Sequence, residues 1–201
     1  MVRKLLLATR NQNKKIELQQ MLNNLDIIVL TFEDINGLPE VEEDGYTFEE
    51  NAVKKSQVIT SASGIVTLAD DSGLVVDALD GQPGVYSARF AGEDADDEKN
   101  NDKLLRLMED IPEAKRTARF ICVIAVSDLK GRTEIVKGRC EGKIAYKPSG
   151  TNGFGYDPLF IPRGFDKTFA ELSSYAKNSI SHRGRALQQV QPVIKKVFQN
   201  Y

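Results

Sequence analysis

The sequence is poor in the residues on which several common active-site chemistries depend. It holds one histidine and two cysteines in 201 residues. The single histidine, His182, nearly excludes zinc sites of the histidine-rich kind and allows at most one Ser-His-Asp arrangement. The two cysteines, Cys122 and Cys140, form no Cys-x-x-Cys pair and suit a reducing cytoplasm, where thiols stay free. Acidic side chains must therefore carry the chemistry.

The sequence also lacks a surplus of basic charge and a long apolar run near its start. The formal net charge is −2, whereas proteins that bind nucleic acids or anionic membranes usually carry a clear excess of lysine and arginine. The first apolar run, residues 5–8, is too short for a signal peptide or a membrane span. We therefore expect a cytoplasmic protein with no nucleic acid and no membrane as partner.

The spacing of apolar residues predicts a single α/β domain over residues 1–201. Hydrophobic side chains make up 41% of the chain and charged side chains 28%, which is enough for one buried core. Thr47 and Glu50 have the spacing of a capping box, and Pro192 should kink or restart the last helix. Strands are expected at 4–8, 27–30, 65–69, 74–78, 120–126 and 134–146, and helices at 13–24, 47–62, 94–110 and from about 181 onward.

The segment between the first strand and the first helix is a candidate phosphate site. It reads Thr9-Arg10-Asn11-Gln12-Asn13-Lys14, and backbone amides at the start of a helix favour an anion. A lysine in the first helical turn, here Lys14, has the wrong charge for the helix dipole unless an anion neutralises it. Lys55 lies on the apolar face of the helix at 47–62 and is a second candidate phosphate contact. The alternatives are a solvated polar loop and a lysine that extends along the apolar surface to water.

Two adjacent carboxylates follow the third expected strand. Asp70 and Asp71 come directly after the apolar segment 65–69, so we expect them together at the edge of a sheet, where α/β proteins commonly place their sites. Hard oxygen ligands of this kind suit Mg²⁺. The alternative is an Asp-rich turn in which Gly73 adopts a positive φ. A nearby acidic run supplies further ligands or is simply solvated; it contains Glu40, Glu42, Glu43 and Asp44.

Two later segments are candidates for recognising the rest of a ligand. The loop 150–158 combines three glycines with two aromatic residues, so its backbone can approach a flat ligand while Phe154 stacks on it. A packed Ω-loop is the alternative. The segment Ser181-His182-Arg183-Gly184 looks like a helix start with hydrogen-bond donors directed outward, and a surface helix cap is the alternative there.

Six motifs, in order along nearly the whole chain, resemble those of the inosine triphosphate pyrophosphatase family. Besides Thr9-Arg10-Asn11-Gln12-Asn13-Lys14, they are Thr47-Phe48-Glu49-Glu50-Asn51-Ala52, Ala69-Asp70-Asp71-Ser72-Gly73-Leu74, Pro83-Gly84-Val85-Tyr86-Ser87-Ala88-Arg89, Gly153-Phe154-Gly155-Tyr156-Asp157-Pro158 and Ile180-Ser181-His182-Arg183-Gly184. The resemblance implies a Mg²⁺-dependent enzyme that hydrolyses non-standard purine nucleoside triphosphates (ITP, dITP and XTP) to the monophosphate and pyrophosphate. Such an enzyme keeps these nucleotides out of DNA and RNA.

The same resemblance implies an architecture. It is a two-lobed α/β domain with a long bent mixed β-sheet flanked by helices, an active-site cleft between the lobes, and a homodimer as the usual assembly. Two other functions remain open from the residues themselves. One is a related pyrophosphatase for modified pyrimidine or methylated nucleotides, and the other is a regulator that binds a nucleotide without turnover.

The resemblance also implies residue roles. Asp71 would be the catalytic proton acceptor and, with Glu43, a ligand of Mg²⁺; Glu42 could replace Glu43 because the alignment is loose there. Many relatives have glycines where this chain has Arg10 and Asn13, so contacts in the phosphate loop are expected to differ. Substrate would be bound by Thr9, Arg10, Asn11, Gln12, Asn13, Lys14, Lys55, Ser72, Phe154, Gly155, Tyr156, Asp157, Lys177, His182 and Arg183.

Overall fold

The computed structural model describes residues 3–22, 27–93 and 96–199. Within these residues, six strands form one sheet in the order β2-β1-β3-β4-β5-β6. Strand β1 runs parallel to β2 and β3, whereas β6 runs antiparallel to β5, so the sheet is mixed and the expected α/β class is confirmed. The strands are β1 Lys4–Leu7, β2 Ile28–Leu30, β3 Val66–Val76, β4 Thr117–Ser127, β5 Thr133–Ile144 and β6 Phe160–Pro162. The α-helices are α1 Gln12–Leu22, α2 Phe48–Ser63, α3 Asp97–Leu107, α4 Ser174–Ile180 and α5 His182–Gln199.

The chain divides into two compact units. Unit 1 comprises residues 1–71, 122–138 and 185–201, and unit 2 comprises residues 72–121 and 139–184. The first boundary therefore falls at the peptide bond between Asp71 and Ser72. The expectation of a single domain over 1–201 stays a prediction.

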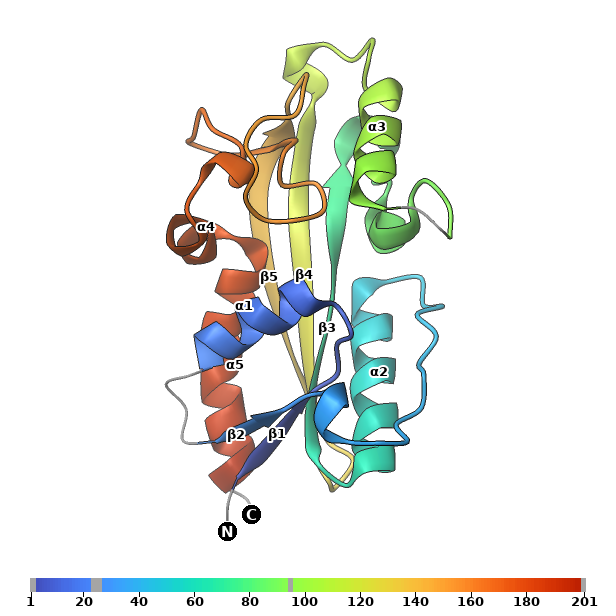
Figure 1. Cartoon of the computed structure of the whole chain (residues 1–201), viewed down its shortest axis with the longest axis vertical. Coiled ribbons are helices and arrows are strands. Elements are labelled where there is room, and N and C mark those ends of the chain that lie inside the picture. The colour runs from blue at the N-terminus through green and yellow to red at the C-terminus, as the bar shows by residue number, and fades with distance from the viewer. Residues whose placement is uncertain (1–2, 23–26, 94–95, 200–201) are drawn as a thin grey trace. The chain divides into compact units, whose positions relative to one another are not determined.

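In unit 1, strand β1 is buried on both faces because its side chains alternate between two hydrophobic clusters. Leu5 belongs to one cluster with Leu18 of α1 and Val190 of α5. Leu6 belongs to the other with Ile59 of α2. Figure 1 shows α5 and α2 on opposite sides of these strands. An uninterrupted apolar strand covered by helices on both faces is typical of parallel sheets.

Helix α2 begins and ends where its sequence provides caps. The Thr47 hydroxyl accepts a hydrogen bond from the Glu50 backbone amide, and the Glu50 carboxylate accepts one from the Thr47 amide, so the predicted capping box is confirmed. Gly64 ends the helix in the left-handed conformation, at φ 65°, and its amide donates to the Thr60 carbonyl. The capping box fixes where the helix starts relative to the acidic run before it.

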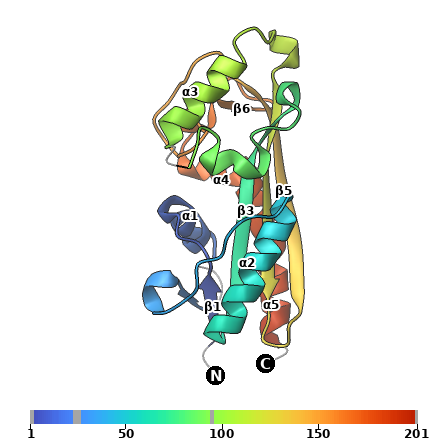
Figure 2. The same cartoon turned by 90° about the vertical axis from the view of Figure 1, so that its right-hand side faces the viewer.

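In unit 2, the core is rich in aromatic rings. Phe120 of β4 makes an edge contact with Phe160 of β6, with centroids 4.8 Å apart, and stacks on Phe169 at 5.9 Å. Helix α3 adds Leu104, and Met108 at its C-cap joins the same cluster. Figure 2 shows α3, β6 and α4 of this unit.

The structure differs from the expected elements in three places. The segments 65–69 and 74–78 are not two strands, because β3 runs unbroken from Val66 to Val76 beside β4, which is equally long. The last helix does not restart at Pro192, because the apolar face on which Val190 and Ile194 lie continues across the proline and stays buried. Strand β6 and the short helix α4 were not expected, since neither segment is long enough for a periodic pattern.

Parts of two expected helices, residues 23–24 and 94–95, lie outside the described residues. In the part of the chain that is described, no helix is both long and apolar enough to cross a membrane. The two cysteines, Cys122 and Cys140, are buried and form no disulfide, as expected.

Candidate active site

The two adjacent carboxylates lie inside strand β3 and are almost completely buried. Asp70 is 1% exposed and Asp71 is 5% exposed. The expectation that they follow the strand is therefore wrong, and so is the alternative of an Asp-rich turn, because Gly73 does not adopt a positive φ. Strand β1 ends at Leu7, which pairs with Leu68, so the carboxylates follow the point at which β3 loses its neighbour on that side. Within β3, they thus lie just past the level at which the neighbouring parallel strand β1 has its carboxyl end, where α/β proteins commonly bind ligands.

Asp70 neutralises the lysine that begins helix α1. Lys14 Nζ lies 3.1 Å from Asp70 Oδ2, and the Asp70 side chain is fully buried. The anion that the position of Lys14 demands is thus supplied by the protein in this structure. An ion pair of this kind can be exchanged when a more highly charged anion arrives.

Asp71 is held by an amide of helix α2. Asn51 Nδ2 donates to Asp71 Oδ2 at 2.9 Å, and Asn51 Oδ1 accepts a hydrogen bond from the Gly45 amide at 2.7 Å. Burial, and after it the negative charge of Glu43, raises the pKa of Asp71 to about 6. Asp71 is consequently a stronger base than an ordinary aspartate.

Glu43 and Lys55 form the third pair in this region. Lys55 Nζ donates to Glu43 Oε1. Burial alone would lower the pKa of Lys55, but Glu43, Asp70 and Asp71 together raise it, so the lysine stays charged. Glu42 is exposed, whereas Glu43 is half-buried and acts electrostatically on Asp71. The geometry therefore favours Glu43 over Glu42 as a partner of Asp71. The acid–lysine cluster, as we call this group of unit 1, comprises Lys14, Glu43, Asn51, Lys55, Asp70 and Asp71.

The donors of the acid–lysine cluster fit a magnesium ion that arrives with phosphate. No group of three or more histidine, cysteine, aspartate or glutamate side chains in the described residues is arranged to hold a metal by itself. Mg²⁺, however, usually takes only one or two protein carboxylates and completes its shell with water and substrate phosphates. Asp71 and Glu43 provide that number, and a divalent cation would relieve the repulsion that helps to raise the pKa of Asp71.

In the candidate phosphate loop, residues 9–14, side chains already form hydrogen bonds with backbone amides of the same loop. Asn11 Oδ1 accepts hydrogen bonds from the amides of Asn13 and Lys14, at 3.0 and 3.1 Å, and so caps helix α1. Gln12 Nε2 donates to Glu33 at 2.8 Å, and the Arg10 guanidinium lies 5.0 Å from the centre of the Phe32 ring. Thr9 Oγ1 accepts a hydrogen bond from the Asn11 amide at 3.3 Å. An anion at this helix start would compete with Asn11 for the same amides.

In unit 2, Phe154 lies beneath two cationic side chains. Lys177 Nζ is 4.9 Å and Arg183 Cζ 5.5 Å from the centre of its ring. Lys177 is buried and forms an ion pair with Asp157 Oδ2 at 2.7 Å, and the same oxygen accepts a hydrogen bond from the Phe154 amide at 2.9 Å. The predicted glycine-rich loop thus places an aromatic ring and two cations together.

The start of helix α5 completes this group, and it is not a surface cap. His182 and Arg183 are 4% and 3% exposed. The His182 ring stacks on Phe120 with centroids 4.6 Å apart, and Arg183 Nη2 donates to Ser72 Oγ at 3.1 Å. The expectation of outward-directed donors was wrong because the packing of unit 2 encloses them. We call Ser72, Phe154, Asp157, Lys177, His182 and Arg183 the Phe154 site.

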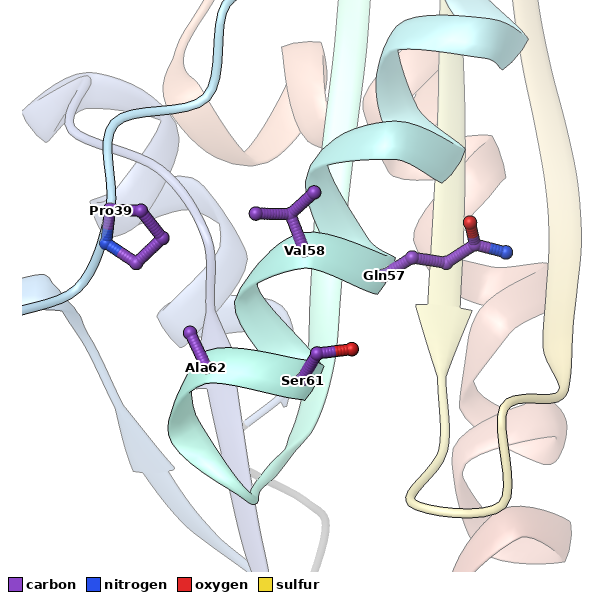
Figure 3. A pocket seen from close by; sticks show the side chains of 5 residues that line it. All are labelled: Pro39, Gln57, Val58, Ser61 and Ala62. Carbon is purple, nitrogen blue, oxygen red and sulfur yellow. The ribbon is translucent and has the colours of Figure 1, made fainter.

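A surface hollow in unit 1 shares no lining residue with the acid–lysine cluster or the Phe154 site. It has a volume of about 490 Å³ and is lined by Pro39 and by Gln57, Val58, Ser61 and Ala62 of α2 (Figure 3). None of these residues belongs to the acid–lysine cluster. The hollow offers apolar surface without a charged side chain, so it does not suit a phosphorylated ligand.

Sequence reasoning missed Asn51 and Gly45 as parts of the site. Asn51 stands in the motif at 47–52, but a buried amide cannot be distinguished from a surface one without the fold. Gly45 allows the acidic run to approach α2, since a side-chain carbon there would lie 2.6 Å from Asn51 Oδ1. Its signal was a glycine directly after the acidic run and two residues before the helix cap.

Known proteins resemble this chain both in sequence and in structure. A family model described as "Ham1 family" matches residues 5–193. A dITP/XTP pyrophosphatase of Desulforamulus reducens is 50% identical over 195 residues, covering 97% of each chain, and one of Geobacter sulfurreducens is 53% identical, covering 92% of each. The solved structure of a HAM1 protein from Coxiella burnetii has a TM-score of 0.89 at 40% identity, covering 98% of this chain and 100% of that one.

Proposed function

The chain belongs to the Ham1 family, and from this premise we propose that it hydrolyses non-standard purine nucleoside triphosphates to the monophosphate and pyrophosphate. The substrates are the inosine, deoxyinosine and xanthosine triphosphates. The resemblance inferred from the six motifs is confirmed by the family match. The observation that carries the proposal is Asp71, a buried carboxylate with a pKa of about 6 beside two lysines and a second carboxylate.

The acid–lysine cluster handles the phosphates. A triphosphate carries roughly four negative charges, so it can draw Lys14 from Asp70 and Lys55 from Glu43. The carboxylate of Glu43 then becomes available, with Asp71, for Mg²⁺. When bound, Mg²⁺ would polarise the phosphate oxygens and offset the charge of the departing pyrophosphate. Arg10, Gln12 and Asn13 of the loop add further donors.

Asp71 acts as the general base. Its carboxylate takes a proton from a water molecule, whose oxygen forms a bond to the α-phosphorus. The bond from that phosphorus to the bridging oxygen breaks, and its electron pair leaves with pyrophosphate. With a pKa of about 6, Asp71 is mostly ionised at neutral pH and still accepts a proton readily. Asn51 holds one carboxylate oxygen and thereby orients the other.

The Phe154 site selects the base. Phe154 stacks on the purine ring, and Lys177, His182 and Arg183 supply donors that suit the 6-oxo group of hypoxanthine and xanthine. Adenine presents a 6-amino donor instead, which would leave those donors unpaired in a buried site. Ser72 orients Arg183 through their hydrogen bond. Gly155, Tyr156 and Asp157 shape the loop around the base.

The proposal also covers assembly and location. A homodimer is expected from the resemblance. A cytoplasmic location is supported by two buried cysteines that form no disulfide. Light scattering of the purified protein at micromolar concentration would report the assembly, and a monomer would contradict it.

A panel of nucleoside triphosphates, assayed for pyrophosphate, tests the function. Inosine and xanthosine triphosphates should release monophosphate and pyrophosphate in equal amounts, with GTP well behind and ATP and pyrimidine triphosphates last. Chelation of Mg²⁺ should abolish turnover. Orthophosphate as the first product would contradict attack at the α-phosphorus, and preference for a modified pyrimidine would favour the related pyrophosphatase. Tight binding without turnover would favour a regulator.

A further inference from the structure

Helix α3 holds both backbone polar groups of Gly155, the residue next to Phe154. The Gly155 amide donates to Asp97 Oδ2 at 2.6 Å, and the Gly155 carbonyl accepts a hydrogen bond from Asn101 Nδ2 at 3.0 Å. Asp97 and Asn101 are four residues apart on the helix, so their side chains lie on one face, one turn apart. A single residue of the loop is therefore gripped at two points.

Gly155 has a left-handed backbone conformation, and a flexible loop adopts it only part of the time unless other contacts fix it. Gly155 has φ +61°, in the left-handed region, and residues 151–153 before it are exposed and outside any helix or strand. On the other side, the Tyr156 hydroxyl donates to the Ser87 carbonyl at 2.8 Å. Phe154 is the half-buried residue between the exposed stretch and this anchored one, and its own amide donates to Asp157. The orientation of its ring therefore depends on how Gly155 is held as well as on that hydrogen bond.

A contribution to folding stability does not by itself explain why residue 101 is an asparagine. It is 9% exposed, and its Oδ1 atom is buried without a hydrogen-bond partner among the described residues. A buried amide that leaves its oxygen unsatisfied costs free energy, and this cost offsets part of what its one hydrogen bond contributes to stability. The contact that distinguishes Asn101 from such a residue is the hydrogen bond to Gly155.

We infer that Asp97 and Asn101 are positioning residues that hold the loop of Phe154 in the orientation needed for purine discrimination. This role rests on the proposed function, because it assumes that Phe154 stacks on the base. When Gly155 is fixed, the Phe154 ring keeps its place beneath Lys177 and Arg183. When Gly155 is released, the ring and the two cations no longer present one aligned surface to the base.

A fluorescence experiment tests the grip without any substrate. The chain has no tryptophan, so Phe154→Trp introduces a single reporter in the loop. In that background, Asp97→Ala and Asn101→Leu should lower the anisotropy of the tryptophan and raise its quenching by acrylamide roughly twofold. Asp97→Asn, which keeps an oxygen acceptor, should restore most of the anisotropy. Values equal to those of the reporter alone would overturn the inference.

The matched control removes a different hydrogen bond from the same helix. Asp96 is the N-cap of α3 and accepts a hydrogen bond from the Lys99 amide at 2.8 Å. Asp96→Ala should lower the melting temperature by about 3 °C and leave the reporter unchanged. Asn101→Leu removes the unsatisfied Oδ1 together with the hydrogen bond to Gly155, so it should lower the melting temperature no more than Asp96→Ala does while it loosens the loop. If Asn101 had a structural role alone, Asn101→Leu would lower the melting temperature more than Asp96→Ala does and would leave the anisotropy of the reporter unchanged.

Kinetics on the chain with Phe154 intact test the positioning role. Asp97→Ala and Asn101→Leu should raise KM for inosine triphosphate about tenfold, with kcat within about twofold and ATP turnover unchanged. A loosened loop with unchanged kinetics would overturn the role in discrimination. Absence of hydrolysis by the unmodified protein would contradict the proposed function and with it that role, while the fluorescence result would still decide whether α3 holds the loop.

Discussion

The acid–lysine cluster of unit 1 and the Phe154 site of unit 2 both collect charged side chains, but they hold them differently. In the acid–lysine cluster, Lys14 and Lys55 are paired with acids, and the Glu43 side chain is one-third exposed. In the Phe154 site, Lys177 is also paired with an acid, Asp157, but both members of that pair are buried, and Lys177 and Arg183 lie against an aromatic ring. The first arrangement can exchange its partners for phosphate and metal, whereas the second is fixed in advance.

The difference matches the two tasks. Phosphates and Mg²⁺ bring their own charge, so a site for them needs counter-charges that can move. A base brings far less charge than a triphosphate, and hypoxanthine differs from adenine at a single polar group, so only donors in fixed positions can tell them apart. The predictions below separate the two regions, beginning with the largest effect.

The largest effect should follow from Asp71→Asn in the acid–lysine cluster. The amide keeps the shape but loses the basicity and most of the metal affinity, so kcat should fall at least ~10²-fold while substrate binding stays measurable. Steady-state and single-turnover kinetics with inosine triphosphate give both quantities. Turnover within a few-fold of the unmodified protein would mean that Asp71 is not the base, and Asp70 would then be the better candidate.

The same substitution should stabilise the metal-free protein at high pH. The pKa of Asp71 is about 6 in the folded state and 3.8 in its usual state, so the folded protein binds the proton more tightly. The contribution of this group to stability is therefore complete below pH 3.8 and is lost as pH rises through 6. At pH 8 with chelator, Asp71→Asn should have a free energy of unfolding higher by up to about 3 kcal/mol.

Urea denaturation from pH 4 to pH 8 measures this difference. The two proteins should converge at the acidic end, where Asp71 is protonated. A constant gap across the whole range would show that the buried charge of Asp71 is not its cause.

Arg183→Ala in the Phe154 site should have a smaller effect that depends on the substrate. We expect kcat/KM for inosine triphosphate to fall about 30-fold, because a charged hydrogen bond to the base is lost, while poor substrates lose little. Comparison of inosine triphosphate, GTP and ATP on the same preparation measures this. An equal loss for all three would move Arg183 from base recognition to phosphate binding.

The smallest effect concerns Asn51, which touches no reacting atom in our account. Asn51→Leu releases Asp71 and the Gly45 amide, so metal affinity should fall about tenfold or more and kcat with it. Titration with Mn²⁺ alone reads the affinity without turnover. Thr60→Val, which removes a buried hydrogen bond to the Ser127 carbonyl from the same helix, is the control. Equal effects of both variants would reduce Asn51 to a role in stability.

Much of the architecture was predictable because it follows from local patterns. The capping box of Thr47 and Glu50 and the apolar strand at 4–8 depend on neighbours in the sequence, and both were found. The pair Asp70 and Asp71 was expected just after the end of a strand, because carboxylates rarely enter a strand interior. Only the position of β4 beside β3, a long-range feature, shows why the strand continues through them.

For the candidate site, the sequence suggested members but not their contacts. The motifs indicated Lys14, Asp71 and Arg183, yet not that Lys14 is paired with Asp70 or that Arg183 is buried. Such pairings join segments far apart in sequence, so no spacing rule reveals them. The same reason explains why Asn51 and the grip of α3 on Gly155 became visible only in the fold.

The division of labour between the two regions is tested most directly by one ratio. It is kcat/KM for inosine triphosphate divided by that for ATP, measured on the unmodified protein, on Asp71→Asn and on Arg183→Ala. Our account predicts that Asp71→Asn lowers both rates and leaves the ratio within about threefold, whereas Arg183→Ala lowers the ratio about tenfold or more. A ratio that collapses in Asp71→Asn, or one that survives in Arg183→Ala, would contradict the assignment of chemistry to one region and base selection to the other.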